Sequence, residues 1–489
     1  MRNTSKNEIL KALTLVLFLP LLAFTVSCSD DDNDPDPDPQ VTQNIVEIAQ
    51  GSSDLSILVS ALTKFPDLVS ALSDDSETFT VFAPTNTAFE SLLGVVGQSG
   101  LDDIPEDVLK RLLQYHVISG TAAMSSGLTD GQTVGTLLTG EEVTVSVDGS
   151  SVSIDAAGVA MADVEAVNGI IHIVDAVLVP SLEASIVGTV VEPAYFNKSF
   201  TTLTAAVVKA ELLSTLIDKS AKFTVFAPTN DAFTAAGITS LDGLEKTDLT
   251  PILFYHVLDF EADKETVAGL GTGSAVSSLG GDSYLSINSD GIFLNGTSEV
   301  VITDIEADNG VVHVIDKTLL PPSSNVVDIA VAASNATEAE FGQLVAALTA
   351  VENDATAANL VTILSSSMAE SGAPFTIFAP TDAAFQSLYS LANVADFAAL
   401  VEAVGIPTIE AVLKYHVVSG ARVFSTDLPN LSSTTVTSLG GTFTLDLATL
   451  KIADTDEALQ LGSSDATIID TDILGTNGLI HVIDQVILP

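Results

Sequence analysis

The sequence predicts a mixed fold of helices and strands that is repeated three times along the chain. One stretch occurs three times, as FTVFAPTNTAF at Phe79–Phe89, FTVFAPTNDAF at Phe223–Phe233 and FTIFAPTDAAF at Phe375–Phe385. Each copy passes from the alternating pattern of a strand, through Ala-Pro-Thr, into the spacing of a helix. The length of 489 residues fits about three domains of ~150 residues each. Three copies of one junction therefore imply three copies of one fold.

The junction itself contains stop and start signals. A proline fixes φ and removes a backbone donor, so we expect each strand to end at Pro84, Pro228 or Pro380. The two residues that follow each proline are predicted N-caps, because their side-chain oxygens can accept from the free N–H groups of the next helix. These residues are Thr85 and Asn86, Thr229 and Asn230, and Thr381 and Asp382.

Helices are predicted on both sides of the junction. The first and third copies open with NIVEIA from Asn44 and NVVDIA from Asn325, where the asparagine is a predicted cap, and the second opens with the looser SIVGTVVE from Ser185. After each junction, apolar residues at helical spacing predict a helix that ends in Tyr-His. The histidine continues the apolar stripe of that helix.

The last part of each copy changes to a period of two, which predicts strands. Two copies read as hairpins with an Asp-Gly turn, Val143–Ile154 with Asp148-Gly149 and Tyr284–Leu294 with Asp290-Gly291. The third, Phe443–Ile452, keeps the alternation without Asp-Gly. Each copy closes with Asn-Gly and a strand, at NGIIHIVDAVLVP from Asn168, NGVVHVIDKTLLP from Asn309 and NGLIHVIDQVILP from Asn477. The last of these ends at Pro489, so we expect the third domain to be complete.

The N-terminus is predicted to direct export. Residues 1–27 have a basic start and an apolar run from Ala12 to Phe24, which is short for a bilayer span of ~20 residues. Cys28, the only cysteine, follows directly, and the segment resembles a bacterial lipoprotein signal, in which this cysteine is lipidated and becomes the mature N-terminus. An ordinary cleaved signal with an incidental cysteine is the alternative. Residues 28–43 are rich in Asp and Pro and are expected to form an extended tether.

Charge excludes several partners. Without residues 1–27 the chain has 13 basic and 63 acidic residues, a net charge near −50, because that segment holds three basic residues and one acidic residue. Such a chain is repelled by nucleic acid and by anionic lipid head groups. It is nevertheless 47% hydrophobic, so we expect globular domains and not an acidic tail.

The FAPT junction, the Tyr-His after a helix and the closing NGxxHxxD strand together resemble the fasciclin domain family. The resemblance implies an α+β fold with three tandem fasciclin-like domains, each a wedge-like β-sandwich flanked by helices. The expected domains are residues 44–180, 181–322 and 323–489, joined by the short linkers Val179–Glu183 and Leu320–Asn325. The resemblance also implies adhesion to other cells, matrix proteins or glycans. The Tyr-His pairs are then the candidate ligand contacts: Tyr115, His116, Tyr255, His256, Tyr415 and His416.

All six histidines lie in the repeats, two in each copy. They can be read as metal or catalytic pairs, or as core residues that hydrogen-bond to a neighbour. Zinc sites need three or four ligands, which no His or Cys cluster supplies, so we expect packing. Period two places Asp175, Asp316 and Asp484 on the opposite strand face from the histidine three residues before. No catalytic motif is recognisable. We therefore expect no catalytic residues, no metal and no cofactor.

Two functions stay open. In the first, the protein is a non-enzymatic, surface-anchored adhesion protein that binds a cell-surface or matrix protein or a glycan, and contacts the membrane through its N-terminal lipid. In the alternative, it is a polysaccharide- or ligand-binding accessory lipoprotein of the cell envelope. Either role predicts an exported, outer-membrane or cell-surface lipoprotein with extracellular domains. Because like-charged chains repel, we expect any self-association to depend on cations or salt.

Overall fold

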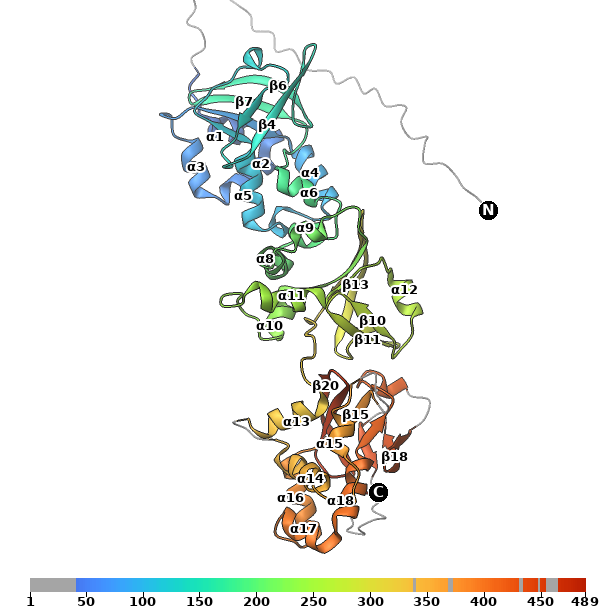
Figure 1. Ribbon diagram of the computed structural model, residues 1–489. Helices are drawn as coiled ribbons and strands as arrows, with labels where there is room; N and C mark the ends of the chain where they lie inside the picture. Colours follow the sequence, from blue (N-terminus) through green and yellow to red (C-terminus); the bar gives the residue numbers. More distant parts are fainter. Residues whose placement is uncertain (1–40, 337–339, 368–372, 431–433, 447–448, 454–464) are drawn as a thin grey trace, which may run out of the picture. The chain divides into compact units, whose positions relative to one another are not determined.

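The computed structural model describes residues 41–336, 340–367, 373–430, 434–446, 449–453 and 465–489 (Figure 1). The predicted signal, Cys28 and most of the predicted tether lie outside these ranges. Residues Gln43–Pro489 form one compact unit. We refer to residues 44–180, 181–322 and 323–489 as domains 1, 2 and 3.

Each domain contains a seven-stranded sheet, and the strand order is the same in all three. In domain 1 the order is β2-β1-β7-β6-β5-β4-β3. Its strands are β1 (Phe79–Pro84), β2 (Val117–Ser119), β3 (Thr133–Gly135), β4 (Glu142–Asp148), β5 (Ser151–Ile154), β6 (Ala157–Ala166) and β7 (Gly169–Val174). Strands β1 and β7 are paired in parallel, with Phe79 opposite Gly169, and the other pairs are antiparallel.

Domains 2 and 3 repeat this sheet. The strands of domain 2 are β8 (Phe223–Pro228), β9 (Val257–Leu258), β10 (Ala275–Ser278), β11 (Gly281–Ile287), β12 (Ile292–Leu294), β13 (Ser298–Ala307) and β14 (Gly310–Ile315). Those of domain 3 are β15 (Phe375–Pro380), β16 (Val417–Ser419), β17 (Thr435–Ser438), β18 (Gly441–Asp446), β19 (Lys451–Ala453), β20 (Ala466–Gly475) and β21 (Gly478–Ile483). The α+β fold expected from the sequence is confirmed.

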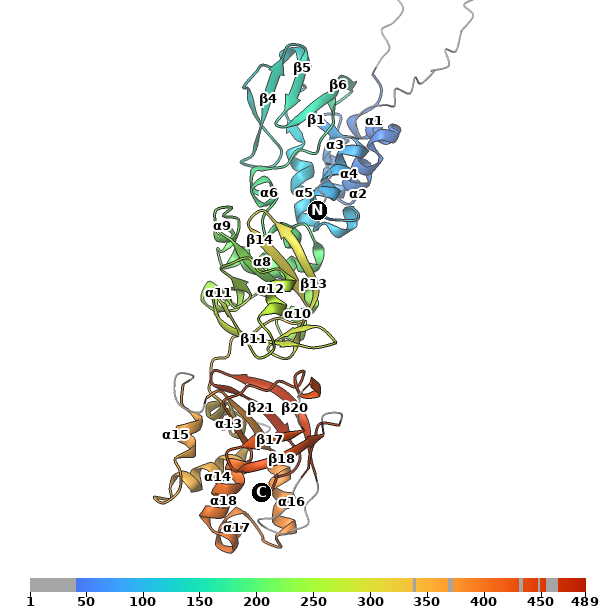
Figure 2. The ribbon, with the colours of Figure 1, turned by 90° about the vertical axis from the view of Figure 1, so that its right-hand side faces the viewer.

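Helices cover one side of the sheet in domain 1, as Figure 2 shows. Domain 1 has α1 (Ile45–Gly51), α2 (Ser56–Thr63), α3 (Pro66–Leu72), α4 (Asn86–Val95) and α5 (Glu106–Tyr115). Domain 2 has α6 (Ser181–Ile186), α7 (Glu192–Tyr195), α8 (Thr201–Lys209), α9 (Leu213–Leu216), α10 (Asn230–Ala235), α11 (Lys246–Phe254) and α12 (Lys264–Gly269). Domain 3 has α13 (Val326–Ser334), α14 (Gly342–Glu352), α15 (Leu360–Leu364), α16 (Asp382–Leu391), α17 (Phe397–Val404) and α18 (Ile406–Tyr415).

The junction works as predicted, with one difference. Thr85 caps α4 by accepting from the amide of Ala88 at 3.2 Å, and Thr229 and Thr381 do the same for α10 and α16. The next residue caps a different helix. Asn86 Oδ1 accepts from the amide of Ile57, the second residue of α2, at 2.9 Å. Asn230 and Asp382 accept in the same way from Thr202 of α8 and Gln343 of α14. Each junction therefore ties two helices together.

One predicted turn is displaced by one residue. Asp148 pairs with Ser151, so the turn residues of this hairpin are Gly149 and Ser150, not Asp148 and Gly149. Gly149 has φ +64°, and a type II′ turn needs positive φ at its first central position, which favours glycine there. The turn in domain 2, between Ile287 and Ile292, does contain Asp290 and Gly291.

Each domain has two apolar cores. One lies between the helices and the sheet. The other lies inside the curl of the sheet, where Phe82 of β1 and Val174 of β7 meet Val143, Val145 and Ile154 near its far edge. This curl gives the sandwich form that was expected.

The core of domain 1 continues into domain 2. The helix-side clusters of both domains form one cluster that includes Ile186, Tyr195 and Phe196. The expected linker Val179–Glu183 is therefore not a free connection, because its end forms the first turn of α6 and Glu183 is fully buried. Within the described residues, no single helix is long and apolar enough to cross a bilayer. Helix α1 and the segment Ser53–Thr63 reach that length only together, across a bend of 104°.

Candidate functional site

The Tyr-His pairs end a helix in each domain, and all six side chains are buried. Helix α5 ends at Tyr115, and His116 follows it, with 4% and 2% of these residues exposed. The buried stripe Leu109, Leu112 and Leu113 holds this end of the helix in the core. The other two pairs are between 1% and 3% exposed: Tyr255, His256, Tyr415 and His416.

The imidazole of His116 joins α5 to the segment that follows the last strand. Its Nδ1 lies 2.7 Å from the carbonyl oxygen of Leu112, so Nδ1 carries the proton and donates, while Nε2 accepts from the amide of Leu178 at 2.8 Å. The same two bonds are made by His256 with Ile252 and Leu319, and by His416 with Val412 and Ile487. Burial lowers the pKa of all three imidazoles to about 4, so they are neutral at pH 7.

The tyrosine of each pair reaches the curled part of the sheet. The hydroxyl of Tyr115 lies 3.0 Å from both the carbonyl oxygen of Glu142 and the carboxylate of Asp155. Tyr255 and Tyr415 donate to the carbonyl oxygens of Asp282 and Thr442, at 2.9 and 2.7 Å. In each domain the tyrosine hydroxyl thus binds the backbone at the equivalent position of the hairpin region.

These contacts limit what the Tyr-His pairs can offer to a ligand. The structure brings the tyrosine and histidine of each pair into the core of one domain, and in domains 1 and 2 the first exposed residues lie three positions beyond the histidine. They are Ser119 and Gly120 in domain 1, and Asp259 and Phe260 in domain 2. Direct ligand contact by the six side chains stays a prediction, and it would require the core to open.

The second histidine of each domain pins a bulge in the long strand next to it. His172 donates from Nε2 to the carbonyl oxygen of Ala123 at 2.9 Å, and its Nδ1 accepts from the amide of Asp163 at 3.3 Å. Asp163 has φ +60° and lies where the β6–β7 register shifts. Its carboxylate accepts from the amide and the hydroxyl of Ser125. His313 with Asp304 and His481 with Asp472 repeat the two hydrogen bonds of the imidazole.

Ser125, Asp163 and His172 have the composition of a catalytic triad, but their hydrogen bonds do not connect them as a triad requires. A nucleophilic serine needs an imidazole nitrogen that can take its proton. Here the serine hydroxyl donates to Asp163, and both nitrogens of His172 are bonded to backbone groups. The arrangement therefore stabilises a loop and a bulge and does not activate a nucleophile.

The aspartates three residues after the second histidine act separately. Asp175 accepts from the amide of Gly158 at 2.7 Å, and Asp316 and Asp484 accept from Glu299 and Thr467. They bond to the backbone of the neighbouring strand, and the opposite faces expected from the period of two stay a prediction. In the part of the chain that the structure describes, no group of three or more His, Cys, Asp or Glu is placed to hold a metal ion.

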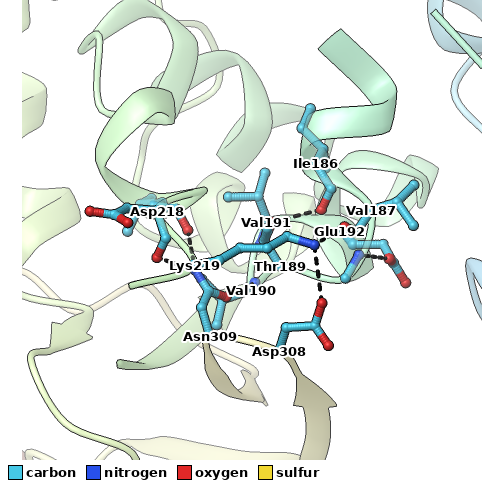
Figure 3. A network of polar contacts seen from close by, with 12 residues as sticks. Ile186, Val187, Thr189, Val190, Val191, Glu192, Asp218, Lys219, Asp308 and Asn309 are labelled. Atoms are coloured by element: carbon cyan, nitrogen blue, oxygen red, sulfur yellow. Dashed lines mark hydrogen bonds and ion pairs between the residues drawn. The ribbon is translucent and has the colours of Figure 1, made fainter. Parts of the chain in front are cut away.

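A buried asparagine, which sequence reasoning missed, closes each domain. Asn309 accepts from the amide of Val190 at 2.8 Å and donates to the carbonyl oxygens of Leu216 and Asp218 at 2.8 and 3.2 Å (Figure 3). It thereby joins the start of the domain, the end of α9 and the turn before β14. Asn168 and Asn477 do the same in domains 1 and 3. The signal in the sequence is the recurrence of Asn-Gly in all three copies, which predicts the start of a strand but not these bonds.

Comparison with known proteins agrees with this repeated design. The family model described as "Fasciclin domain" matches residues 53–180, 198–321 and 342–489. Human periostin is 25% identical over 464 residues, which cover 92% of this chain and 48% of periostin. Protein sll1483 of Synechocystis sp. is 41% identical over 138 residues, which cover 27% of this chain and 74% of that protein. The pig transforming growth factor-beta-induced protein ig-h3 is 26% identical over 253 residues, 51% of this chain and 35% of that protein.

Among solved structures, a FAS1 domain pair from the insect cell adhesion molecule Fasciclin I matches with 19% identity and a TM-score of 0.25, over 55% of this chain and 97% of that chain. The three family matches cover more than half of the chain and contain all three Tyr-His pairs and all three closing strands. The chain belongs to the fasciclin domain family.

Proposed function

We propose that the protein is a non-enzymatic adhesion protein of the cell surface, which binds other cells, matrix proteins or glycans through exposed faces of its fasciclin domains. One observation carries the proposal. The histidines, tyrosines and asparagines that recur in all three domains are buried and hydrogen-bonded within their own domain, so the shared residues build the fold. Recognition is then left to surface residues that differ between the copies.

Two further points support an adhesive role. Membership of the fasciclin domain family and the similarity to periostin along most of this chain agree with adhesion. The surface that follows the Tyr-His pair of domain 2 also differs from the other two copies, with Asp259-Phe260 in place of Ser119-Gly120 and Ser419-Gly420. Phe260 is 39% exposed and is a candidate contact residue of domain 2. The three domains need not bind the same partner.

The proposed location rests on the N-terminal sequence. Lipidation of Cys28 would anchor the chain, since several acyl chains at ~0.8 kcal/mol per buried CH₂ hold a protein on a membrane almost permanently. Cell-surface labelling and protease treatment of intact cells, with wild type and Cys28→Ser, test this anchor. We expect surface-exposed wild-type protein and release of the variant. Equal retention of both would contradict the anchor.

Adhesion is tested with beads coated with the released Cys28→Ser chain. We expect saturable binding to cells, matrix proteins or glycans that soluble protein displaces, and weaker binding by Phe260→Ser if domain 2 contributes. Beads coated with an unrelated protein of similar net charge are the control. Binding no stronger than that of the control beads would refute adhesion.

Self-association is expected to need cations. At a net charge near −50, two copies repel each other, and divalent ions or salt weaken that repulsion. Light scattering with calcium, with magnesium and with chelator at low salt measures this. Equal association in chelator would refute bridging by cations.

The alternative role, ligand binding, is favoured by one observation, the cleft between α5 of domain 1 and α8 of domain 2.

A further inference from the structure

A cleft of about 570 Å³ lies where α5 of domain 1 meets α6, α7 and α8 of domain 2, inside the compact unit Gln43–Pro489. Its walls include Val108, Leu182, Tyr195, Ala205 and Val208. This volume lies within the ~300–1,000 Å³ of small-molecule sites, which occur preferentially between domains. By contrast, the cavities beside His116, His256 and His416 measure only 30–40 Å³ each.

A buried ion pair fixes one side of this cleft. Glu183 is fully buried, and its carboxylate accepts from Arg111 Nε at 2.6 Å, from Arg111 Nη2 at 3.4 Å and from the hydroxyl of Tyr195 at 3.0 Å. The hydrogen bond from Glu183 raises the pKa of Arg111, which stays charged. Arg111 also lines the cleft, and the described residues provide no acceptor for its Nη1. A fixed guanidinium with a spare donor edge is therefore available to a ligand oxygen.

The wall on α8 is more apolar than the same face of α2 in domain 1. The two helices are placed in register by equivalent bonds, from Thr202 to Asn230 and from Ile57 to Asn86. Ala205 and Val208 then correspond to Ser60 and Thr63, which are exposed. Val208 is 52% exposed, although water contact with its side chain is unfavourable. The apolar residues thus occur where the helix faces the cleft.

The charges around the cleft balance locally. Arg111 is paired with Glu183, and Lys209 and Asp107 both line the opening. An anion in the cleft therefore meets nearly neutral surroundings in a chain whose formal net charge is −48. The carboxylate of such an anion can accept from Arg111, and its apolar body can cover Leu182, Ala205 and Val208.

We propose that this cleft binds a small amphipathic carboxylate, with its carboxylate on Arg111 and its apolar body against α6 and α8. The inference does not depend on the adhesive role.

Calorimetric titration of the full mature chain, carrying Cys28→Ser, with octanoate and with octanol tests the proposal. We expect saturable binding of octanoate, and binding of octanol at least tenfold weaker because it lacks the carboxylate. Val208→Glu is expected to weaken octanoate binding at least tenfold, because it adds bulk and a like charge to the wall. Thr63→Glu, the matching position on α2 with the same change in charge, is expected to leave it within twofold.

Three results would overturn the proposal. The first is that wild type does not bind octanoate at millimolar concentration. The second is that octanoate and octanol bind equally well, which rules out carboxylate recognition. The third is that Val208→Glu and Thr63→Glu behave alike. Circular dichroism of both variants shows whether they are folded, and because both positions lie on exposed helix faces, we expect native spectra.

Discussion

The amide of Leu178 donates a hydrogen bond to Nε2 of His116 at a distance of 2.8 Å. This nitrogen can accept the bond only while the imidazole is neutral. The same relationship links Leu319 to His256 and Ile487 to His416. Protonation would break the bond and place a charge in the core. Because the histidine belongs to the Tyr-His motif, the motif also makes each domain sensitive to acid.

We expect the protein to lose stability as the pH falls from 6.5 to 4. The pKa of each imidazole is about 4 when folded and about 6.5 when unfolded, so the unfolded chain binds more protons in this window. The stabilisation is fully present above pH 6.5, and the loss reaches about 3 kcal/mol per domain below pH 4. Urea unfolding at pH 7, 5.5 and 4.5 measures it. His256→Gln should remove the contribution of domain 2 to this pH-dependent loss. Stability that is independent of pH over this range would show the explanation to be wrong.

Asn309→Ala is expected to destabilise domain 2 by about 2–4 kcal/mol. The substitution leaves the amide of Val190 and the carbonyl oxygens of Leu216 and Asp218 without their buried partner. Urea unfolding measures the change. Asn335→Ala is the control, because Asn335 makes an exposed side-chain bond to the carbonyl oxygen of Val331. It should cost less than about 1 kcal/mol, and equal effects would argue against the closing role of Asn309.

Gly310→Ala is expected to disrupt the β8–β14 pairing and to cost more than about 3 kcal/mol. A Cβ at Gly310, where φ is +145°, would lie 1.9 Å from the carbonyl oxygen of Phe223. Gly237→Ala separates the steric clash from the effect of positive φ, since Gly237 has φ +79° but nothing within 4 Å of the added carbon. We expect that control to cost about 1 kcal/mol. Thermal unfolding compares the two, and similar losses would mean that φ alone matters.

Arg111→Gln is expected to destabilise the junction of domains 1 and 2 by about 3–5 kcal/mol, because it leaves the buried carboxylate of Glu183 without its charged partner. The double variant Arg111→Gln with Glu183→Gln should recover most of this loss. A double-mutant cycle in urea measures the coupling. Additive effects of the two substitutions would show that the pair is not coupled.

The sequence was sufficient to predict what local patterns determine. Thr85 was recognisable as a cap, and the helix that ends in Tyr-His and the strand that follows Asn-Gly were found from their periods. Contacts between distant segments were not predictable in this way. Asn86 caps α2, Asn168 holds α1, and Glu183 pairs with Arg111 across 72 positions. Residue types and spacing give no measure of which polar groups meet once the chain has folded.

The same limit applies to the candidate site. Tyr115 and His116 were singled out as a motif, and their burial followed from the apolar stripe, but their partners Glu142 and Leu178 belong to other segments. The cleft beside Arg111 could not be found from the sequence, because it depends on how α5 and α8 pack.

The parallel pairing of β1 with β7 determines when each domain can finish folding. Phe79 lies opposite Gly169, and β7 is the strand that connects β1 to β6 in the sheet. A ribosome releases β7 last of the seven strands, so the nascent domain lacks the strand between β1 and β6 until its synthesis is almost over. A domain whose sheet closes this late cannot complete its fold while most of its chain is still being synthesised.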